Sequence, residues 1–203
     1  MRKIGLLVIF MCLASAPAIA ADPVVIAAFG DSLFSGYGIE VGQAVPAQIE
    51  QKLTQAGSPV TVINDGIAGN TTADGLARVD SVLQQNPAIV IIEFGSNDLL
   101  RRISPVEARK NLELIMQRFQ QAKIKMILTG QEAPLVNVGL AYSAAYNGIF
   151  SELASKYNAT LYPSILNGVY GHPDMVLPDG LHPNEKGADY IAGQLAPLVK
   201  KLL

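Results

Sequence analysis

The sequence predicts an α/β protein in which helices cover both faces of a parallel sheet, a three-layer α/β/α sandwich. Short apolar runs alternate along the chain with segments of helical periodicity. Each apolar run is nearly continuous, which is typical of strands that are buried on both faces. The 203 residues, 50% hydrophobic and 16% charged, are enough for one sizeable core. No repeat, low-complexity tract or linker divides the chain, so we expect a single domain.

The five expected strands are the apolar runs themselves. They are Val24–Phe29, Val60–Ile63, Ile89–Phe94, Ile124–Leu128 and a weaker run, Thr160–Tyr162. Glycines at positions 30, 36 and 38 follow the first run and free the backbone for tight turns. Gly130 marks the end of the fourth run. The pattern leaves the order of the strands in the sheet open.

The helical segments between and after these strands have recognisable boundaries. They are Pro46–Gln55, Thr72–Gln85, Pro105–Ala122, Ser143–Tyr157 and Glu185–Leu203. Ser104 before Pro105 is typical of a helix start, because proline is tolerated in the first turn. Pro46 likewise falls in the first turn of the predicted helix Pro46–Gln55, and Gly57 follows the end of that helix.

The first 20 residues have the pattern of a cleavable secretory signal. Arg2 and Lys3 are followed by the apolar stretch Ile4–Leu13 and then by Ala18-Ile19-Ala20. A membrane anchor is disfavoured, because the apolar stretch is shorter than the roughly 20 residues that span a bilayer. We therefore expect residues 1–20 to be a signal peptide, cleaved near Ala20 and Ala21, and residues 21–203 to be the single domain. The mature protein is then expected to be periplasmic or secreted, without stable membrane insertion.

Composition excludes several classes of function. Cys12 is the only cysteine and lies inside the predicted signal, so the mature chain would have no disulfide, cysteine nucleophile or thiolate metal site. Loss of Arg2 and Lys3 would take the formal charge from −2 to −4, and no run of basic residues suits a phosphate backbone. We therefore expect no nucleic-acid partner.

A serine at the end of the first strand is the first candidate for chemistry. Ser32 lies in "AAFGDSLFSGYG", where an apolar strand meets a glycine-rich loop. In open α/β sheets ligands bind at the carboxyl ends of the strands. The alternative is a turn serine that caps the next helix. The stretches "DGIAGNTTADG", "GSND" and "LPDGLHP" follow other strands or lie in late loops, so they add polar groups where the fold binds ligands.

A serine nucleophile needs a base, and imidazole has its pKa near working pH. The sequence offers His172 and His182. Asp179 lies three residues before His182, so one tight loop can hold the carboxylate against the ring N–H. His172 is separated from Asp174 by a proline, which fits an exposed turn. We expect His182 to be the base and His172 to be a solvated loop residue.

Acyl transfer also needs hydrogen-bond donors aimed at the oxyanion. Asn97 offers a side-chain amide, Gly69 a backbone N–H that no Cβ obstructs, and Ser32 its own N–H. Each has an ordinary structural alternative: a turn after the strand for Asn97, and a helix entry capped by Asn70 or Thr71 beside Gly69.

Four blocks in this order resemble the SGNH (GDSL) hydrolases. They are "GDSL" at Gly30–Leu33, the glycine at position 69, "GSND" at Gly95–Asp98 and "DGLH" at Asp179–His182. The wider text "VINDGIAGNTTADGLAR", "IIEFGSND", "GQEAP" and "LPDGLHPNEKG" is similar to the small exported bacterial arylesterases, among which are multifunctional thioesterases and lysophospholipases. The resemblance covers essentially all of the chain after Ala21.

The resemblance implies a flavodoxin-like fold and a role for each block. Ser32 would be the nucleophile, His182 oriented by Asp179 the base, and the Ser32 N–H, Gly69 and Asn97 the oxyanion hole. The implied activity is hydrolysis of aryl and short-to-medium-chain acyl esters through an acyl-serine intermediate, with thioesters and lysophospholipids as further candidates. Phe34, Ser35 and Ser96 differ from the residues that are usual in this family, and these differences bear on the shape of the pocket.

Two rival classes stay open at this point. A metal-dependent phosphoesterase would need several histidines and carboxylates around its ions, and a catalytically inactive flavodoxin-like module would bind a ligand without turning it over. We expect no cofactor and no metal, and a small-molecule acyl ester or thioester as the partner. The segment Glu132–Tyr146 is apolar with two tyrosines, so it could line an acyl groove or pack into the core. The sequence leaves the oligomeric state open.

Overall fold

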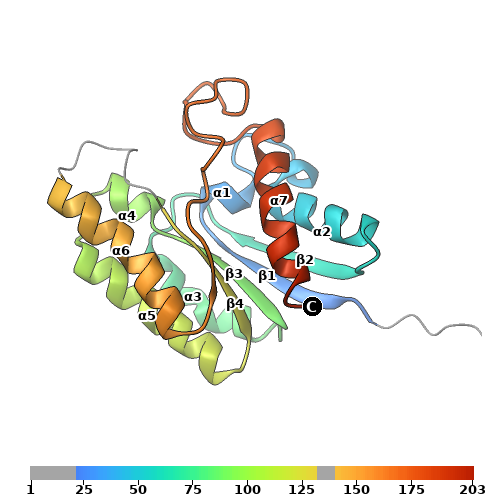
Figure 1. The fold of residues 1–203 in the computed structure, drawn as a ribbon, viewed down its shortest axis with the longest axis horizontal. Helices are drawn as coiled ribbons and strands as arrows, with labels where there is room; N and C mark the ends of the chain where they lie inside the picture. Colours follow the sequence, from blue (N-terminus) through green and yellow to red (C-terminus); the bar gives the residue numbers. More distant parts are fainter. Residues whose placement is uncertain (1–21, 132–139) are drawn as a thin grey trace, which may run out of the picture.

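The computed structural model describes residues 22–131 and 140–203, and its strands form one parallel sheet (Figure 1). The order across the sheet is β2-β1-β3-β4-β5, every neighbouring pair being parallel. The strands are β1 (Val24–Gly30), β2 (Val60–Gly66), β3 (Ile89–Glu93), β4 (Lys125–Thr129) and β5 (Thr160–Tyr162). This is the flavodoxin-like order, in which the direction of winding reverses between β1 and β3. The predicted fold class is therefore confirmed.

Helices cover both faces of the sheet, as the pattern predicted (Figure 1). One face is covered by α2 (Val45–Gln55) and α7 (Glu185–Lys200), and the other by α3 (Thr72–Leu83), α5 (Pro105–Gln121) and α6 (Leu140–Lys156). Three short elements add to these: α1 (Ser32–Ser35), the 3-10 turn η1 (Val41–Gln43) and α4 (Ser96–Leu100). Both α1 and α4 begin directly beyond the carboxyl ends of strands, where the candidate site lies.

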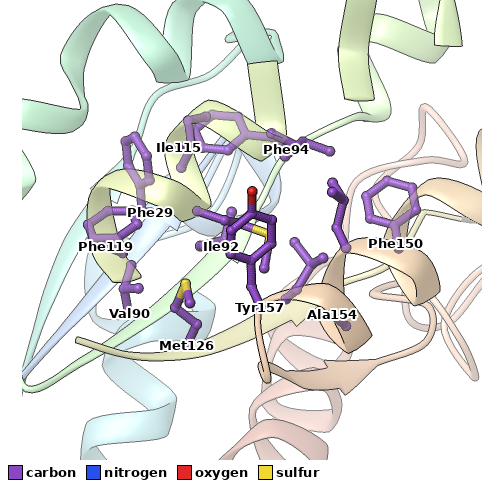
Figure 2. Close-up of a cluster of buried hydrophobic side chains, with 14 of the residues drawn as sticks. Phe29, Val90, Ile92, Phe94, Ile115, Phe119, Met126, Phe150, Ala154 and Tyr157 are labelled. Atoms are coloured by element: carbon purple, nitrogen blue, oxygen red, sulfur yellow. The ribbon is translucent and has the colours of Figure 1, made fainter. Parts of the chain in front are cut away.

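Two hydrophobic clusters explain why the strands read as continuous apolar runs. Along β1, Ile26 and Ala28 face the α2/α7 layer, while Ala27 and Phe29 face the α3/α5/α6 layer. Figure 2 shows the second cluster, in which the Phe29 ring lies edge-on to the rings of Phe94 and Phe119, with centroids 4.8 and 5.9 Å away. Because both faces of β1 are buried, the strand has no polar face to alternate with the apolar one.

The structure corrects several expected boundaries. The helix predicted to reach Gln85 ends at Leu83, because the Gln85 N–H bonds to Val82 O and Asn86 has a positive φ of 51°. The last helix ends at Lys200 rather than Leu203. The short helices α1 and α4 were not predicted, since four or five residues are too few to show a helical period.

Two predictions concern residues that lie outside the described ranges. These are the signal peptide at residues 1–20 and the part of the apolar segment at 132–139. Tyr146, at the end of that segment, is fully buried in the core, so for this residue the packing alternative holds. No helix among residues 22–131 and 140–203 combines the length and the apolar character that crossing a membrane requires.

Candidate active site

The junction of β1 and α1 places Ser32 at the carboxyl edge of the sheet. Asp31 is the N-cap of α1, and its Oδ1 accepts a hydrogen bond from the Leu33 N–H at 3.0 Å. The alternative in which Ser32 caps this helix is therefore wrong. Gly66 at the end of β2 allows α1 to pack closely, since a Cβ there would lie 2.3 Å from the Ser35 nitrogen. Ser32 lines a pocket at this edge.

The hydroxyl of Ser32 is in hydrogen-bond contact with the imidazole of His182. Ser32 Oγ lies 3.0 Å from His182 Nε2, and His182 Nδ1 lies 2.6 Å from Asp179 Oδ2. If Nδ1 carries the ring proton and donates it to Asp179, Nε2 is left to accept from the Ser32 hydroxyl. The structure thus brings together the three side chains that the sequence singled out, in the arrangement of a nucleophile, a base and an orienting carboxylate.

The loop before α7 is folded so that Asp179 and His182 face each other. Asp179 Oδ1 accepts from the main-chain N–H groups of Leu181 at 2.9 Å and His182 at 3.0 Å. Gly180 between them has a φ of +71°, a conformation that glycine adopts without strain. The Leu177 N–H closes the loop by donating to His182 O at 2.8 Å. His172 is exposed on the same loop, as expected for a solvated residue.

The surroundings of Asp179 favour its ionised form. Burial alone would raise its pKa, but hydrogen bonds from the His182 ring and from the two main-chain N–H groups outweigh burial and hold the pKa below its usual range. The group therefore stays ionised at neutral pH, where it can stabilise a positively charged imidazole. The ring of Tyr37 also lies against the imidazole, with its centroid 4.4 Å from that of His182. The sequence analysis did not single out Tyr37.

The loop after β2 presents Gly69 to the same pocket. Gly69 has a φ of +83°, and its carbonyl accepts a hydrogen bond from Arg101 Nη2 at 2.8 Å. Thr71 rather than Asn70 caps α3, in a reciprocal pair with Asp74. Within the residues that the structure describes, the N–H groups of Ser32 and Gly69 donate to no protein acceptor. Both are therefore available to an oxyanion.

Asn97 lies on α4, shortly after β3, and its side-chain amide contacts Asp31, the residue before Ser32. Its Nδ2 donates to Asp31 Oδ2 at 3.0 Å and to the Asn70 carbonyl at 3.1 Å. The following residue, Asp98, anchors α4: it is fully buried and accepts from the Thr72 N–H at 2.8 Å and the Thr72 hydroxyl at 2.5 Å. Asn97 thus faces the pocket on a helix that is tied to the start of α3.

Sequence analysis missed two groups beneath the site. Glu93 is a fully buried carboxyl at the end of β3, and a charged residue inside an apolar run was the signal that could have found it. Arg78 on α3 connects the end of β1 to the loop after β2, because its Nη2 donates to Gly30 O and its Nε to Asn70 Oδ1, each at 2.8 Å. Its guanidinium also lies 4.5 Å from the centroid of the Phe29 ring.

The pocket itself is small and lined mostly by apolar side chains. Its volume is about 200 Å³. It is lined by Ser32, Leu33, Tyr37, Ala68, Gly69, Ser96, Asn97, Leu100, Leu181 and His182. In the described part of the chain, no group of three or more His, Cys, Asp and Glu side chains could hold a metal ion. The polar groups that converge in this pocket are two serine hydroxyls, an imidazole and a side-chain amide.

Comparisons with known proteins agree with this geometry. Residues 28–190 match the model of the GDSL-like lipase/acylhydrolase family. The chain is 35% identical over 196 residues to the thioesterase 1/protease 1/lysophospholipase L1 of Escherichia coli (strain K12), covering 94% of this chain and 91% of that protein. It is 34% identical to an arylesterase of Vibrio mimicus, covering 97% of each.

A solved structure extends the similarity to three dimensions. AlinE4, an SGNH-hydrolase family esterase, superposes with a TM-score of 0.76 at 41% identity, covering 91% of this chain and 98% of that one. The comparisons support neither the phosphoesterase nor the inactive binding module. The chain is a carboxylic ester hydrolase and belongs to the GDSL-like lipase/acylhydrolase family.

Proposed function

We propose that the protein hydrolyses esters through an acyl-serine intermediate formed on Ser32. The observation that carries the proposal is the continuous contact from Ser32 Oγ through the His182 ring to Asp179, at 3.0 and 2.6 Å. Ser32 Oγ attacks the carbonyl carbon while His182 Nε2 takes the hydroxyl proton. When the tetrahedral intermediate collapses, the leaving alcohol receives that proton and the acyl group stays on Ser32.

The second half of the reaction uses the same groups in reverse. A water molecule attacks the acyl-serine carbonyl and gives a proton to His182. Collapse releases the carboxylic acid, and the proton returns to Ser32 Oγ. In both halves the oxyanion would be held by the N–H groups of Ser32 and Gly69 and by the amide of Asn97. No cofactor takes part in any step.

The pocket supports small acyl groups as the substrates that fit best. Its volume of about 200 Å³ is below the roughly 300 Å³ at which pockets for drug-sized ligands begin. Ala68, Leu100 and Leu181 give it apolar walls, so we propose aryl and short-to-medium-chain acyl esters. The names of the relatives add thioesters and lysophospholipids as candidates. A longer chain would extend beyond the pocket over Leu100, which is 41% exposed.

Two substitutions test the assignment of the nucleophile. Ser32→Ala should lower kcat by several orders of magnitude on p-nitrophenyl esters, while Ser35→Ala, one turn along the same helix, should stay within about threefold of the parent. Near-normal turnover by a folded Ser32→Ala protein would refute the assignment. A series of p-nitrophenyl esters of rising chain length, run beside acyl-CoA and a lysophospholipid, would rank the three substrate classes.

We also propose that the protein is exported and that its first 20 residues are removed. The support is the pattern of Arg2 and Lys3 before an apolar stretch and Ala18-Ile19-Ala20. A mature chain without cysteine would fold in an oxidising compartment with no risk of wrong disulfides. N-terminal sequencing of protein released by osmotic shock should begin at or near Ala21. An intact Met1 on protein recovered from the cytoplasm would contradict the proposal.

A further inference from the structure

Two carboxyl groups lie buried side by side beneath the nucleophile. Asp31 and Glu93 follow or end the adjacent strands β1 and β3, and both side chains are fully buried. The Asp31 N–H donates to Glu93 Oε2 at 3.0 Å, so the two buried residues are in direct contact. Gly30 makes room for this pair, because a Cβ there would lie 2.6 Å from Glu93 Oε2. The ester hydrolysis described above uses neither group.

A buried pair of this kind holds a single proton between its members. Two carboxylates in contact and away from water repel each other, so one of them stays neutral. Burial raises the pKa of Asp31 to about 6, against hydrogen bonds from Leu33, Glu93 and Asn97 that favour its charge. Burial and the neighbouring Asp31 raise the pKa of Glu93 well above its usual range. The proton therefore stays on Glu93, and Asp31 is the anion.

The anion of this pair is the group that orients Asn97. A carboxylate oxygen can only accept hydrogen bonds, so Asp31 Oδ2 selects the Nδ2 end of the Asn97 amide, at 3.0 Å. A protonated Asp31 could instead donate to the amide oxygen, and the amide could turn over. The second amide hydrogen points to the Asn70 carbonyl at 3.1 Å. An oxyanion bound at Gly69 can compete for that hydrogen while the bond to Asp31 holds the amide in place.

Glu93 is itself fixed by a chain of neutral groups. Its Oε1 accepts from Gln131 Nε2 at 2.8 Å, and Gln131 Oε1 accepts from the Ser96 hydroxyl at 2.8 Å. Both partners are buried, and Ser96 is the residue before Asn97. Oε1 is thus the oxygen on the Gln131 side, and Oε2, which accepts the Asp31 N–H, is the oxygen next to Asp31. These hydrogen bonds thus connect the Glu93 carboxyl to α4, the short helix that carries Asn97.

We propose that Glu93 is a positioning residue for ester hydrolysis: it keeps its proton, donates it to Asp31, and so holds Asp31 as the acceptor that fixes Asn97 for the oxyanion. The proposal rests on the role of Asn97 proposed above. The other titratable or charged groups around the pair are His182, Asp98, Tyr146 and Arg78, which bonds to Gly30 O. None of them donates a hydrogen bond to either carboxyl group in the described residues.

A double-mutant cycle with Asn97 separates positioning from a merely structural role. Glu93→Gln keeps an N–H donor toward Asp31 but loses the acceptor of the Asp31 N–H, so it should retain at least threefold more of the parent kcat than Glu93→Met does. Glu93→Met removes the donor and should lower kcat at least tenfold at pH 8, with KM changed less than twofold. In the Asn97→Ala background the same Glu93→Met change should cost less than twofold in kcat, because the amide that it positions is gone.

A second variant covers the case in which Glu93→Met fails to fold. Asp31→Asn keeps a good helix cap but replaces the acceptor by an amide, so it should lower kcat at least tenfold in the parent and less than twofold with Asn97→Ala. Equal costs in both backgrounds, or a loss with Glu93→Gln as large as with Glu93→Met, would overturn the inference alone. An unchanged kcat for Asn97→Ala by itself would overturn the oxyanion role and this inference together.

Discussion

His182 Nε2 lies 3.0 Å from Ser32 Oγ although 150 positions separate the two residues in the chain. The contact exists because β1 lies inside the sheet and the loop before α7 returns to the carboxyl end of that strand. The winding of a flavodoxin-like sheet reverses at this point and leaves a crevice there. The nucleophile and the base therefore come from opposite ends of the domain, and their contact depends on the whole fold.

The two histidines give a matched pair of variants. His182→Ala should lower kcat/KM by at least about a thousandfold, because Ser32 loses its base. His172→Ala should change it by less than twofold, since His172 is exposed on the same loop and outside the pocket. Steady-state assays on one p-nitrophenyl ester check both, with circular dichroism as the control for folding. Equal losses in the two variants would argue against His182 as the base.

Asn97→Ala separates binding from catalysis. The variant should lower kcat by roughly 10² to 10³ with little change in KM, because an oxyanion donor matters chiefly when charge develops on the carbonyl oxygen. The change leaves Asp98, which ties α4 to Thr72, in place. Initial-rate curves over a range of ester concentrations give both constants. A rise in KM with kcat preserved would make Asn97 a ground-state contact instead.

Activity should climb with pH through the histidine range. A protonated imidazole cannot accept the Ser32 proton, and histidine ordinarily gains that proton between about pH 5 and 8. Asp179 should not limit the rate in this range, because hydrogen bonds hold its pKa below the usual value for aspartate. Asp31, whose pKa burial raises to about 6, should add to the fall in activity at low pH, because its protonation releases Asn97. Rates of p-nitrophenyl ester hydrolysis, corrected for the ionisation of p-nitrophenol, measure the profile. A flat profile from pH 5 to about 8 would contradict the role of His182.

The free energy of unfolding should depend on pH through Glu93. The pKa of Glu93 is raised in the folded state, so folding takes up a proton once the pH exceeds its ordinary value of 4.5. Such a group stabilises the fold fully below that value, and its contribution is lost as the pH rises, by about 1.4 kcal/mol per unit for one proton. The free energy of unfolding, measured with urea, should fall less steeply between pH 5 and 6 for Glu93→Gln than for the parent. Identical slopes would mean that Glu93 is ionised in the folded protein.

Periodicity and turn chemistry were enough to predict the sheet, its five strands and the helices of both layers. They could not supply the strand order, because every crossover has a similar pattern and the order depends on which helices pack together. They also missed α1 and α4, which are short and owe their form to the strand ends that precede them. These two helices carry Ser32 and Asn97, so the geometry of the site was less visible in the sequence than its residue types.

The candidate site could be predicted where chemistry demands particular side chains at fixed spacing. Asp179 and His182 are three residues apart and meet within one loop, so the pair is local. Glu93, Arg78 and Tyr37 act through contacts between distant segments, and such contacts leave no short-range pattern. Of these three residues, only Glu93 lies inside a predicted apolar run, and the residues that bury it, Asp31 and Gln131, come from other segments of the chain.

The most direct test of the account is to locate the covalent intermediate. A fluorophosphonate probe should add one group per chain, and peptide mapping by mass spectrometry should place it on Ser32 Oγ, with Ser35 unmodified. Prior incubation with a p-nitrophenyl ester should slow the labelling, and Ser32→Ala should take up no probe. Loss of activity with the label on another residue, or full activity in protein whose Ser32 is labelled, would contradict the account.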